Sequence, residues 1–412
     1  MAEVRPFGCV RPAPEFAARV ASLPYDVYNR AEAKIAAAKD PLAFINIDRP
    51  ETQFADNADM YSDEVYARAK EMFEQQAADG VYITEETPCY YIYELTMDGR
   101  SQTGVVACSS IDEYLDGTIK KHENTRAEKE ADRIRHVDTL SAQTGPIFLA
   151  YRGSDAVNAI VGAVKADPQA LLYDFTAEDG VRHSVWRIAN EDLKARLAQA
   201  FDEVPNTYIA DGHHRAASAV KVGLKRRGED PGYTGAEEFN YFLSVLFPDD
   251  QLMIMDYNRV VKDLNGLTNE QFLDAVSAAF ETERAESRPF RPQRKGEFGM
   301  YLDGQWYRLI SRKAPTGDPV ADLDVSVLQD ELLSPVLGIG DPRTDERIDF
   351  VGGIRGLGEL ERRCSLDMKV AFAMYPTSIG ELFAVADAGL LMPPKSTWFE
   401  PKLRSGLFIH RF

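Results

Sequence analysis

Residues 207–218 read Thr-Tyr-Ile-Ala-Asp-Gly-His-His-Arg-Ala-Ala-Ser, and they decide how the central part of this chain folds. The run 207–210 is apolar and contains the β-branched and aromatic residues that are typical of a strand. An Asp-Gly pair then marks a break in the pattern. Apolar residues return at helical spacing after it, at Ala216, Ala219 and Val220. The stretch therefore predicts a strand, a tight turn and a helix, in that order.

The first turn of this predicted helix carries His213, His214 and Arg215, three side chains that are able to bear positive charge. A helix N-terminus has unpaired N–H groups and the positive end of the dipole, so acidic residues are the usual occupants. Cations there are unfavourable unless an anion binds. The turn, with Asp211 and Gly212 before it, thus predicts a phosphate or carboxylate site. The alternative is that the histidines are polar surface and Arg215 pairs with neighbouring acids.

Composition limits the classes of function. With 412 residues, the chain is long enough for two domains or for one large α/β domain. The 66 acidic residues outnumber the 47 basic ones, and a net charge of −19 argues against nucleic acid or an anionic membrane as a partner. No apolar stretch is long enough to span a bilayer, and no signal-peptide pattern is present, so we expect a cytoplasmic protein. We expect a small-molecule substrate, and self-assembly is left open.

A second polar cluster follows the sequence Lys-Lys-His-Glu-Asn-Thr-Arg at 120–126. It places the Glu123 carboxylate among several basic side chains. Such surroundings keep a carboxylate ionised and available as a proton acceptor or a metal ligand. The alternative is the solvated start of a helix, with charges paired along its surface.

A third cluster lies near the end of the sequence, where Pro-Pro-Lys-Ser-Thr-Trp-Phe occupies 393–399. Two prolines stiffen the approach to Lys395, Ser396 and Thr397, whose ammonium and hydroxyl donors suit a phosphate. The alternative is a tail that docks its aromatic residues on the core. The chain has no Walker-type loop, no Gly-x-Gly-x-x-Gly turn between a strand and a helix, and no His-Glu-x-x-His helix. The usual P-loop, dinucleotide and zinc-helix motifs are therefore disfavoured.

The pattern along the chain predicts a mixed α/β fold, with one portion over 1–264 and a second over 265–412. We expect a helix over 30–39, a strand over 43–47 and a helix-prone segment over 111–143. We also expect the following strand pairs: 90–97 with 104–109 around a turn at Asp98-Gly99, 171–175 with 183–188, and 241–247 with 253–257 as a hairpin through the core.

Several short motifs together resemble one protein family. They are Leu23-Pro-Tyr-Asp-Val27, His122-Glu-Asn-Thr125, Asp132-Arg133, Gly145-Pro-Ile-Phe148, Ala210-Asp-Gly-His-His-Arg215 and Met392-Pro-Pro-Lys-Ser-Thr397. Their order is that of the bacterial and archaeal family known as domain of unknown function 1015. The Asp-Gly-His-His-Arg turn is also similar to the phosphate-binding turn of the ParB/sulfiredoxin-like superfamily, whose members include kinases of free L-serine. This second resemblance implies a ParB/sulfiredoxin-like nucleotide-binding core with added α/β elements.

By this resemblance, Gly212, His213, His214 and Arg215 hold the phosphates of ATP or ADP, and a carboxylate takes the proton of the serine hydroxyl. We expect Glu123 to be that base. We also expect catalytic roles for Asp211 and His213, with Mg²⁺ binding as the alternative role of Asp211. The remaining expected roles are closure over the phosphates by Lys395, Ser396 and Thr397, and acceptor binding by Tyr25, Asp26, His122, Thr125 and Arg126. Two other functions stay open, which are a nucleotide-binding regulator without kinase activity and a phosphate-ester hydrolase.

Overall fold

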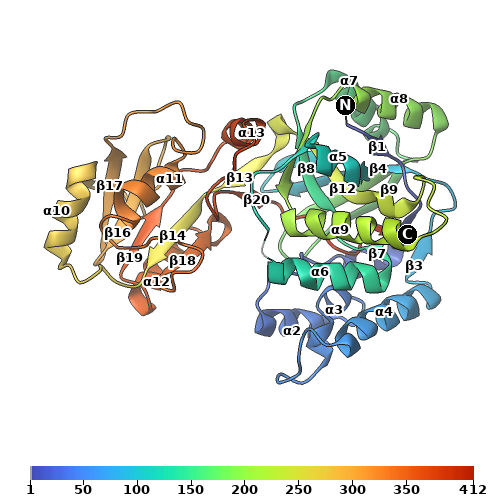
Figure 1. Cartoon of the computed structure of the whole chain (residues 1–412), viewed down its shortest axis with the longest axis horizontal. Helices are drawn as coiled ribbons and strands as arrows, with labels where there is room; N and C mark the ends of the chain where they lie inside the picture. Colours follow the sequence, from blue (N-terminus) through green and yellow to red (C-terminus); the bar gives the residue numbers. More distant parts are fainter. Residues whose placement is uncertain (1, 126) are drawn as a thin grey trace. The chain divides into compact units, whose positions relative to one another are not determined.

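The computed structural model describes residues 2–125 and 127–412, and the chain forms two compact units (Figure 1). The first unit runs to Leu252 and also includes Pro401–Phe412, whereas the second is Met253–Glu400. The second unit is therefore inserted in the sequence of the first. The boundary expected near residue 264 falls inside the second unit. Both units combine helices with sheets, which confirms the predicted mixed α/β class.

A large mixed sheet forms the centre of the first unit. Strand β11 is parallel to β6 and antiparallel to β8, β8 is parallel to β12, and the strands beyond β12 are antiparallel. The strands, in spatial order, are β6 (Ile119–Lys120), β11 (Thr207–Asp211), β8 (Ile147–Tyr151), β12 (Tyr241–Pro248), β5 (Arg100–Ser110), β4 (Tyr90–Met97), β10 (Arg182–Ile188) and β9 (Leu171–Thr176), with β1 (Val4–Arg5) also paired to β5. This order places β11 near one edge, beside the short strand β6.

A smaller sheet of the first unit joins strands that are distant in sequence. Its order is β3 (Tyr82–Thr84), β2 (Cys9–Pro12), β21 (Ile409–Arg411) and β7 (Ala142–Gln143). All of its pairings are antiparallel. Because β21 follows the inserted second unit in the sequence, the smaller sheet is complete only when the chain has returned from that insertion.

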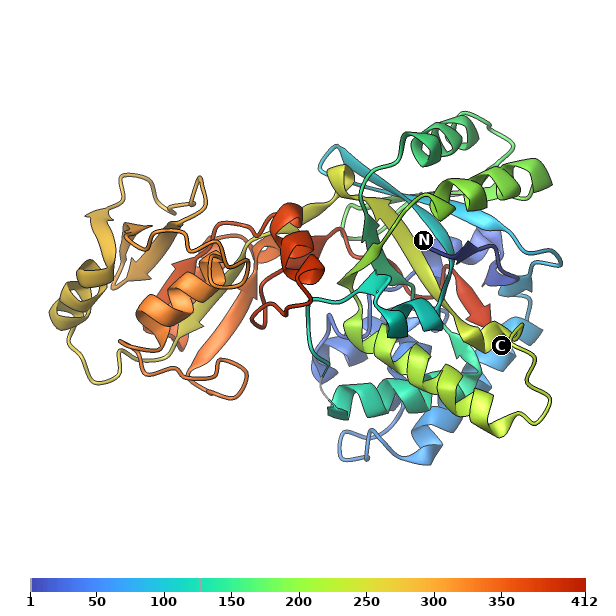
Figure 2. The same cartoon turned by 45° about the horizontal axis from the view of Figure 1, so that its top comes forward.

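Helices cover the sheets of the first unit, and α6 and α9 lie side by side in two views (Figures 1 and 2). Lys225 and Arg226 of α9 both pair with Asp138 of α6. The apolar face of α9 packs into the core beneath the large sheet. The helices are α1 (Ala17–Val20), α2 (Arg30–Lys39), α3 (Ile45–Asp48), α4 (Asp63–Ala78), α5 (Ile111–Asp116), α6 (Ala127–Leu140), α7 (Asp155–Lys165), α8 (Glu191–Asp202) and α9 (His213–Glu229).

The helix-prone segment 111–143 contains the two helices α5 and α6, with the short strand β6 between them. Two of the expected elements are wrong. The segment 43–47 was expected as a strand but ends in helix α3, because a short apolar run suits either element. The segments 241–247 and 253–257 do not form a hairpin: β12 joins the large sheet, and the second segment contributes to strands of the second unit.

The second unit has its own sheet and its own core. The sheet order is β15 (Phe280–Arg284), β17 (Gln305–Ser311), β16 (Glu297–Leu302), β19 (Val370–Ala373), β14 (Tyr257–Val261) and β18 (Ile348–Gly352), and a separate pair joins β13 (Met253–Met255) to β20 (Trp398–Glu400). Its helices are α10 (Asn269–Ala279), α11 (Asp324–Leu328), α12 (Gly358–Leu366) and α13 (Ile379–Asp387). Buried Trp306 packs in this core. The described residues form no helix with the length and apolar character that are needed to cross a membrane.

Candidate functional site

The turn between β11 and α9 has the predicted strand–turn–helix form. Gly212 is the residue before the helix, and its φ of 92° lies in the left-handed region, which glycine adopts without a steric penalty. Gly212 has no side chain with which to cap α9, and the first turn of α9 contains no acidic residue. The start of α9 therefore combines the positive end of the helix dipole with an absence of acidic side chains, which favours an anion there.

His213, the first residue of α9, points into the protein rather than to solvent. Its side chain is buried against that of His122, with ring centroids 4.5 Å apart and planes at 88°. Neither ring nitrogen of His213 has a hydrogen-bond partner. Burial and the neighbouring His122 lower the pKa of His213 well below its usual value. The sequence suggested a possible cation at His213, but the structure makes this imidazole neutral.

His122 reaches His213 because β6 pairs with β11. The register sets Thr207 beside Ile119 and Tyr208 beside Lys120, so the chain after β6 passes the start of α9. The His122 ring donates to the backbone carbonyl of Ile209, while its Nδ1 has no partner. Burial lowers the pKa of His122 to about 4. His122 is therefore a neutral, buried residue and not one of the cations expected around Glu123.

The rest of the 120–126 cluster divides between the site and its surroundings. Glu123 is partly exposed, and one of its carboxylate oxygens lies within 4.8 Å of a ring nitrogen of His122 and of His213. The Lys121 ammonium lies 4.2 Å from the Tyr114 ring centroid. Thr125 donates from its hydroxyl to Glu130 at 2.7 Å. Arg126, the residue expected to bind the acceptor carboxylate, lies outside the described residues.

Asp211 is held by two partners at the end of β11. Its Oδ1 accepts from the N–H of Gly212 at 2.8 Å, and its Oδ2 lies 2.8 Å from the Lys402 ammonium. Burial opposes ionisation of this carboxyl, but the Lys402 ammonium outweighs it and the pKa falls to about 2. The sequence gave no role to Lys402, because 191 residues separate it from Asp211.

Arg215 connects three of the sequence motifs. Its Nη1 donates to the Pro146 carbonyl at 3.3 Å, and its Nη2 lies 3.6 Å from the Asp26 carboxylate. Its guanidinium carbon lies 5.4 Å from the Tyr25 ring centroid. Gly145 leaves room for this arrangement, since a Cβ there would lie 3.1 Å from Nη1 of Arg215. The structure therefore brings Tyr25 and Asp26 close to Arg215, and their expected role in acceptor binding stays a prediction.

Two guanidinium groups lie near the Tyr25 ring. The second is that of Arg133, whose guanidinium carbon is 4.1 Å from the ring centroid, and Arg133 is itself paired with Asp132 at 2.8 Å. Arg49 donates to the Tyr25 carbonyl at 2.9 Å and fixes the loop. Arg133 and Asp132 belong to the motifs that carried the family resemblance, but the sequence gave them no function.

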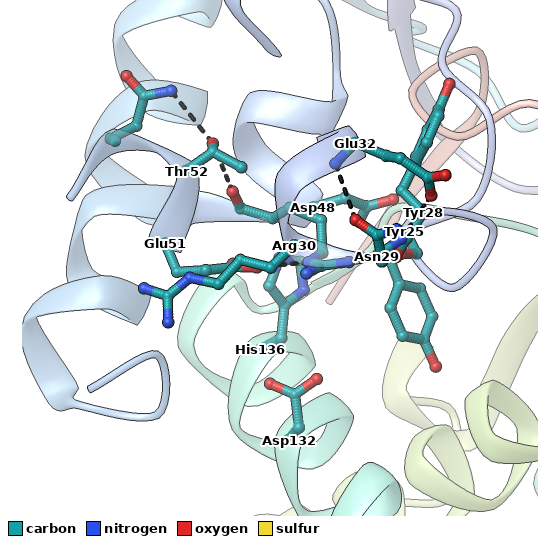
Figure 3. Close-up of polar contacts among 12 residues, drawn as sticks. Tyr25, Tyr28, Asn29, Arg30, Glu32, Asp48, Glu51, Thr52, Asp132 and His136 are labelled. Atoms are coloured by element: carbon teal, nitrogen blue, oxygen red, sulfur yellow. Dashed lines mark hydrogen bonds and ion pairs between the residues drawn. The ribbon is translucent and has the colours of Figure 1, made fainter. Parts of the chain in front are cut away.

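Helix α6 contributes side chains to the region around Tyr25. Figure 3 shows Asp132 and His136 extending from α6 toward the segment that carries Asp48. Nε2 of His136 lies 2.9 Å from the Ile47 carbonyl oxygen, and burial lowers the pKa of this histidine. Thr144 donates to the Asp48 carboxylate at 3.1 Å. The His136 contact thus joins α6 to α3, and the Thr144 contact joins the segment after β7 to α3.

Two cavities meet at Tyr25 and Arg133. The smaller one, about 30 Å³, extends to Arg215 and is lined in addition by Asp48 and Gly145. The larger one, about 160 Å³, has both acidic and basic walls: its charged lining residues are Asp26, Arg49, Glu51, Lys129, Asp132 and Arg133. A hollow that offers carboxylates and cations together suits a small ligand that carries both charges.

The segment Lys395–Thr397 belongs to the second unit. Arg259 donates to the Lys395 carbonyl at 2.9 Å, and the Ser396 hydroxyl donates to the Pro393 carbonyl at 2.6 Å. Lys395 has a φ of 60°, and its ammonium lies 5.6 Å from the Tyr257 ring centroid. These contacts all lie within the second unit. The expected closure of this segment over bound phosphates stays a prediction.

The comparisons with known proteins agree with the family that the motifs indicated. The family model described as "Protein of unknown function (DUF1015)" matches residues 4–326, and the chain belongs to that family. No curated protein matches the sequence.

Solved structures with a similar arrangement include three chains at low similarity. A free serine kinase in complex with AMP has 15% identity and a TM-score of 0.35, with 74% of this chain and 92% of that chain covered. SbnI from Staphylococcus aureus, with a C-terminal truncation, has 11% identity and a TM-score of 0.39, with coverages of 73% and 85%. A conserved hypothetical protein from Pyrococcus furiosus has 15% identity and a TM-score of 0.34, with coverages of 74% and 94%.

Proposed function

We propose that this protein is a phosphotransferase that moves a phosphoryl group from ATP or ADP to the hydroxyl of a small acceptor, free L-serine. The observation that carries the proposal is the convergence on Arg215. The uncapped N-terminus of α9, the Gly145-Pro146 turn and the Tyr25-Asp26 loop all meet at this guanidinium. Phosphoryl transfer depends mainly on positioning and charge neutralisation, which such a site supplies.

In this proposal the donor phosphates bind at the start of α9. The N–H groups of the first turn and the Arg215 guanidinium neutralise them, with His214 beside them. His213 is neutral and donates one N–H at most. Both carboxylate oxygens of Asp211 already have partners, so Asp211 positions the turn and fits poorly as a magnesium ligand. Mg²⁺ then enters as part of the nucleotide substrate.

The acceptor hydroxyl attacks the terminal phosphorus atom in line with the bond that breaks. The new O–P bond forms as the bond to the nucleotide oxygen breaks, and Glu123 accepts the hydroxyl proton. The larger cavity beside Tyr25, with its mixture of acidic and basic walls, receives the ammonium and carboxylate groups of the amino acid. Asp26 is the candidate partner of the ammonium group.

The test is direct product formation. Purified protein is incubated with L-serine, ATP or ADP and Mg²⁺, and O-phosphoserine is measured by mass spectrometry. We expect Arg215→Ala to lower the rate by more than about tenfold, or more than ~1.4 kcal/mol of transition-state stabilisation. Arg196→Ala, at an exposed position of α8, is the matched control and retains the rate.

Three results contradict the proposal. Nucleotide binding without product from any hydroxylated amino acid identifies a regulator. Release of phosphate in the absence of an acceptor identifies a hydrolase. If Arg215→Ala leaves the rate unchanged, Arg215 does not contribute to the reaction.

A further inference from the structure

Three ring nitrogens of the buried His122–His213 pair have no hydrogen-bond partner. These are Nδ1 of His122 and both ring nitrogens of His213. Both side chains are more than nine-tenths buried, at 2% and 5% relative exposure. A buried polar atom without a partner costs about 1–3 kcal/mol, so three in one contact call for a ligand.

The orientation of His122 is that of a metal ligand. Metal-binding histidines usually donate one ring N–H to a carbonyl or carboxylate, which fixes the ring and leaves the other nitrogen for the ion. His122 donates to the Ile209 carbonyl, and its Nδ1 carries the unused lone pair. The neighbouring ring is His213, whose centroid is 4.5 Å away.

Glu123 supplies a third ligand atom. One ligand atom from each of His122, Glu123 and His213 lies within 4.8 Å of the other two. Ligands at about 2.0–2.1 Å from a tetrahedral ion are about 3.4 Å apart, so binding needs a small contraction. The Glu123 side chain is only partly buried, and rotation about its own bonds supplies that movement. Asp211 is not counted among the ligands, because Lys402 holds it.

We propose that His122, Glu123 and His213 form a binding site for a divalent transition metal ion, with Zn²⁺ as the best fit. Two imidazoles and one carboxylate suit zinc, whereas Mg²⁺ prefers an all-oxygen octahedron. Three protein ligands leave a fourth position open to water or to a ligand oxygen.

The site also has a consequence for phosphoryl transfer, and this part rests on the proposed function. Glu123 cannot accept a proton while its carboxylate is bound to the ion. Zinc therefore inhibits the transfer, and a chelator restores it. Zinc binding is measured without any turnover. A failure of the zinc proposal is therefore distinguishable from a failure of the proposed phosphotransferase activity.

The test measures metal binding to the full chain after treatment with a chelator. Zn²⁺ is titrated in competition with a chromophoric chelator, and Co²⁺ is titrated for its absorption spectrum. We expect one Zn²⁺ ion per chain and a tetrahedral Co²⁺ spectrum, with Mg²⁺ in millimolar excess unable to compete. Glu123→Gln weakens zinc binding at least about tenfold, and His122→Ala and His213→Ala at least about 100-fold, since even outer partners of a metal contribute 10- to 100-fold.

His214→Gln is the matched control, because His214 neighbours His213 but does not belong to the cluster. It retains zinc affinity within about threefold. Since Glu123 is less buried than the two histidines and Gln is close to it in size, Glu123→Gln is expected to fold even where a histidine variant does not, and circular dichroism verifies this. The proposal is overturned if no ion binds, if Glu123→Gln binds zinc as tightly as the unaltered chain, or if His214→Gln abolishes binding. A full Co²⁺ titration with only an octahedral spectrum overturns it as well.

Discussion

Two successive strand–helix pairs of the first unit, β10–α8 and β11–α9, differ in the capping and the charge at the start of their helices. In the first pair, Asn190 caps α8 by accepting from the Leu193 N–H at 3.0 Å, and Glu191 and Asp192 occupy the first turn. In the second pair, α9 has neither a side-chain cap nor an acid in its first turn. The two helices therefore differ at their N-termini: α8 has a side-chain cap and acidic residues, and α9 has neither.

The buried histidines of the two pairs differ in the same way. His183 of β10 has partners at both ring nitrogens, the Tyr93 hydroxyl at 2.7 Å and the Arg404 guanidinium at 3.2 Å. His213 of α9 has none at either nitrogen. Since both side chains are buried, exposure does not explain the difference. Of these two buried histidines, only His213 therefore has ring nitrogens without hydrogen-bond partners.

The largest expected effect comes from placing an acidic residue in the first turn of α9, as is found in the first turn of α8. His214→Glu places a negative charge where the proposed phosphates bind, and we expect nucleotide affinity to fall by about 100-fold, or ~2.7 kcal/mol. The same change suits the helix dipole and raises the free energy of unfolding without ligand by about 0.3–1 kcal/mol. Calorimetry and urea unfolding measure the two effects. If His214→Glu and the unaltered chain bind nucleotide with equal affinity, the phosphates do not bind at the start of α9.

The reverse exchange at α8 is the control. Glu191→His lowers the free energy of unfolding by about 0.3–1 kcal/mol, because it removes a favourable charge from the first turn. It leaves nucleotide affinity unchanged.

The second prediction concerns pH and the fully paired histidine. Burial, aided by the Arg404 guanidinium, lowers the pKa of His183 to about 3. Between pH 6.5 and pH 3 the unfolded chain therefore binds a proton that the folded chain does not, and stability falls as the pH falls. From pH 6.5 to pH 5, His183 accounts for a loss of about 2 kcal/mol.

Urea unfolding at several pH values measures this contribution. The unaltered chain loses about 2 kcal/mol more than His183→Gln over that range, whatever the stability of the variant at neutral pH. Parallel curves for the two proteins contradict the assignment of a depressed pKa to His183.

The third prediction tests the turn before α9. Gly212→Ala forces a residue with a Cβ into the left-handed region, which costs about 1–2 kcal/mol of folding free energy. Gly212→Asn costs less, because asparagine tolerates that region. Thermal unfolding ranks the three proteins. If alanine is tolerated as well as asparagine, the positive φ does not determine the residue at this position.

The smallest effect is expected at the cap of α8. Asn190→Ala removes the acceptor for the Leu193 N–H and lowers the free energy of unfolding by about 1 kcal/mol. Asn190→Ser retains most of the cap. Neither variant alters nucleotide binding, which calorimetry checks. A change in affinity here means that the two helix N-termini are not independent.

Local signals explain what could be predicted from the sequence. Helix α2 begins and ends as expected, because Asn29 and Glu32 form a capping box that fixes its start. The β4–β5 hairpin turns at Asp98-Gly99, where both residues have positive φ. The β11–α9 turn was predicted for the same reason, since the Asp-Gly break is a short-range signal.

Contacts over long sequence distances explain what the sequence missed. Lys402 holds Asp211, and Arg133 stacks on Tyr25, but neither contact leaves a pattern in neighbouring residues. The neutral state of His213 also depends on burial by the fold, which the spacing of residues does not report. Composition similarly gave no sign that β12 and β13 belong to different units.

The insertion of the second unit imposes an order on biosynthesis. Lys402, Arg404 and β21 all emerge from the ribosome after the whole of Met253–Glu400. Until they do, Asp211 lacks its ammonium partner and β2 lacks its neighbour in the smaller sheet. A nascent chain in which the Asp211–Arg215 turn has been translated therefore still lacks contacts of the first unit. Those contacts form only after Pro401–Phe412 has been synthesised.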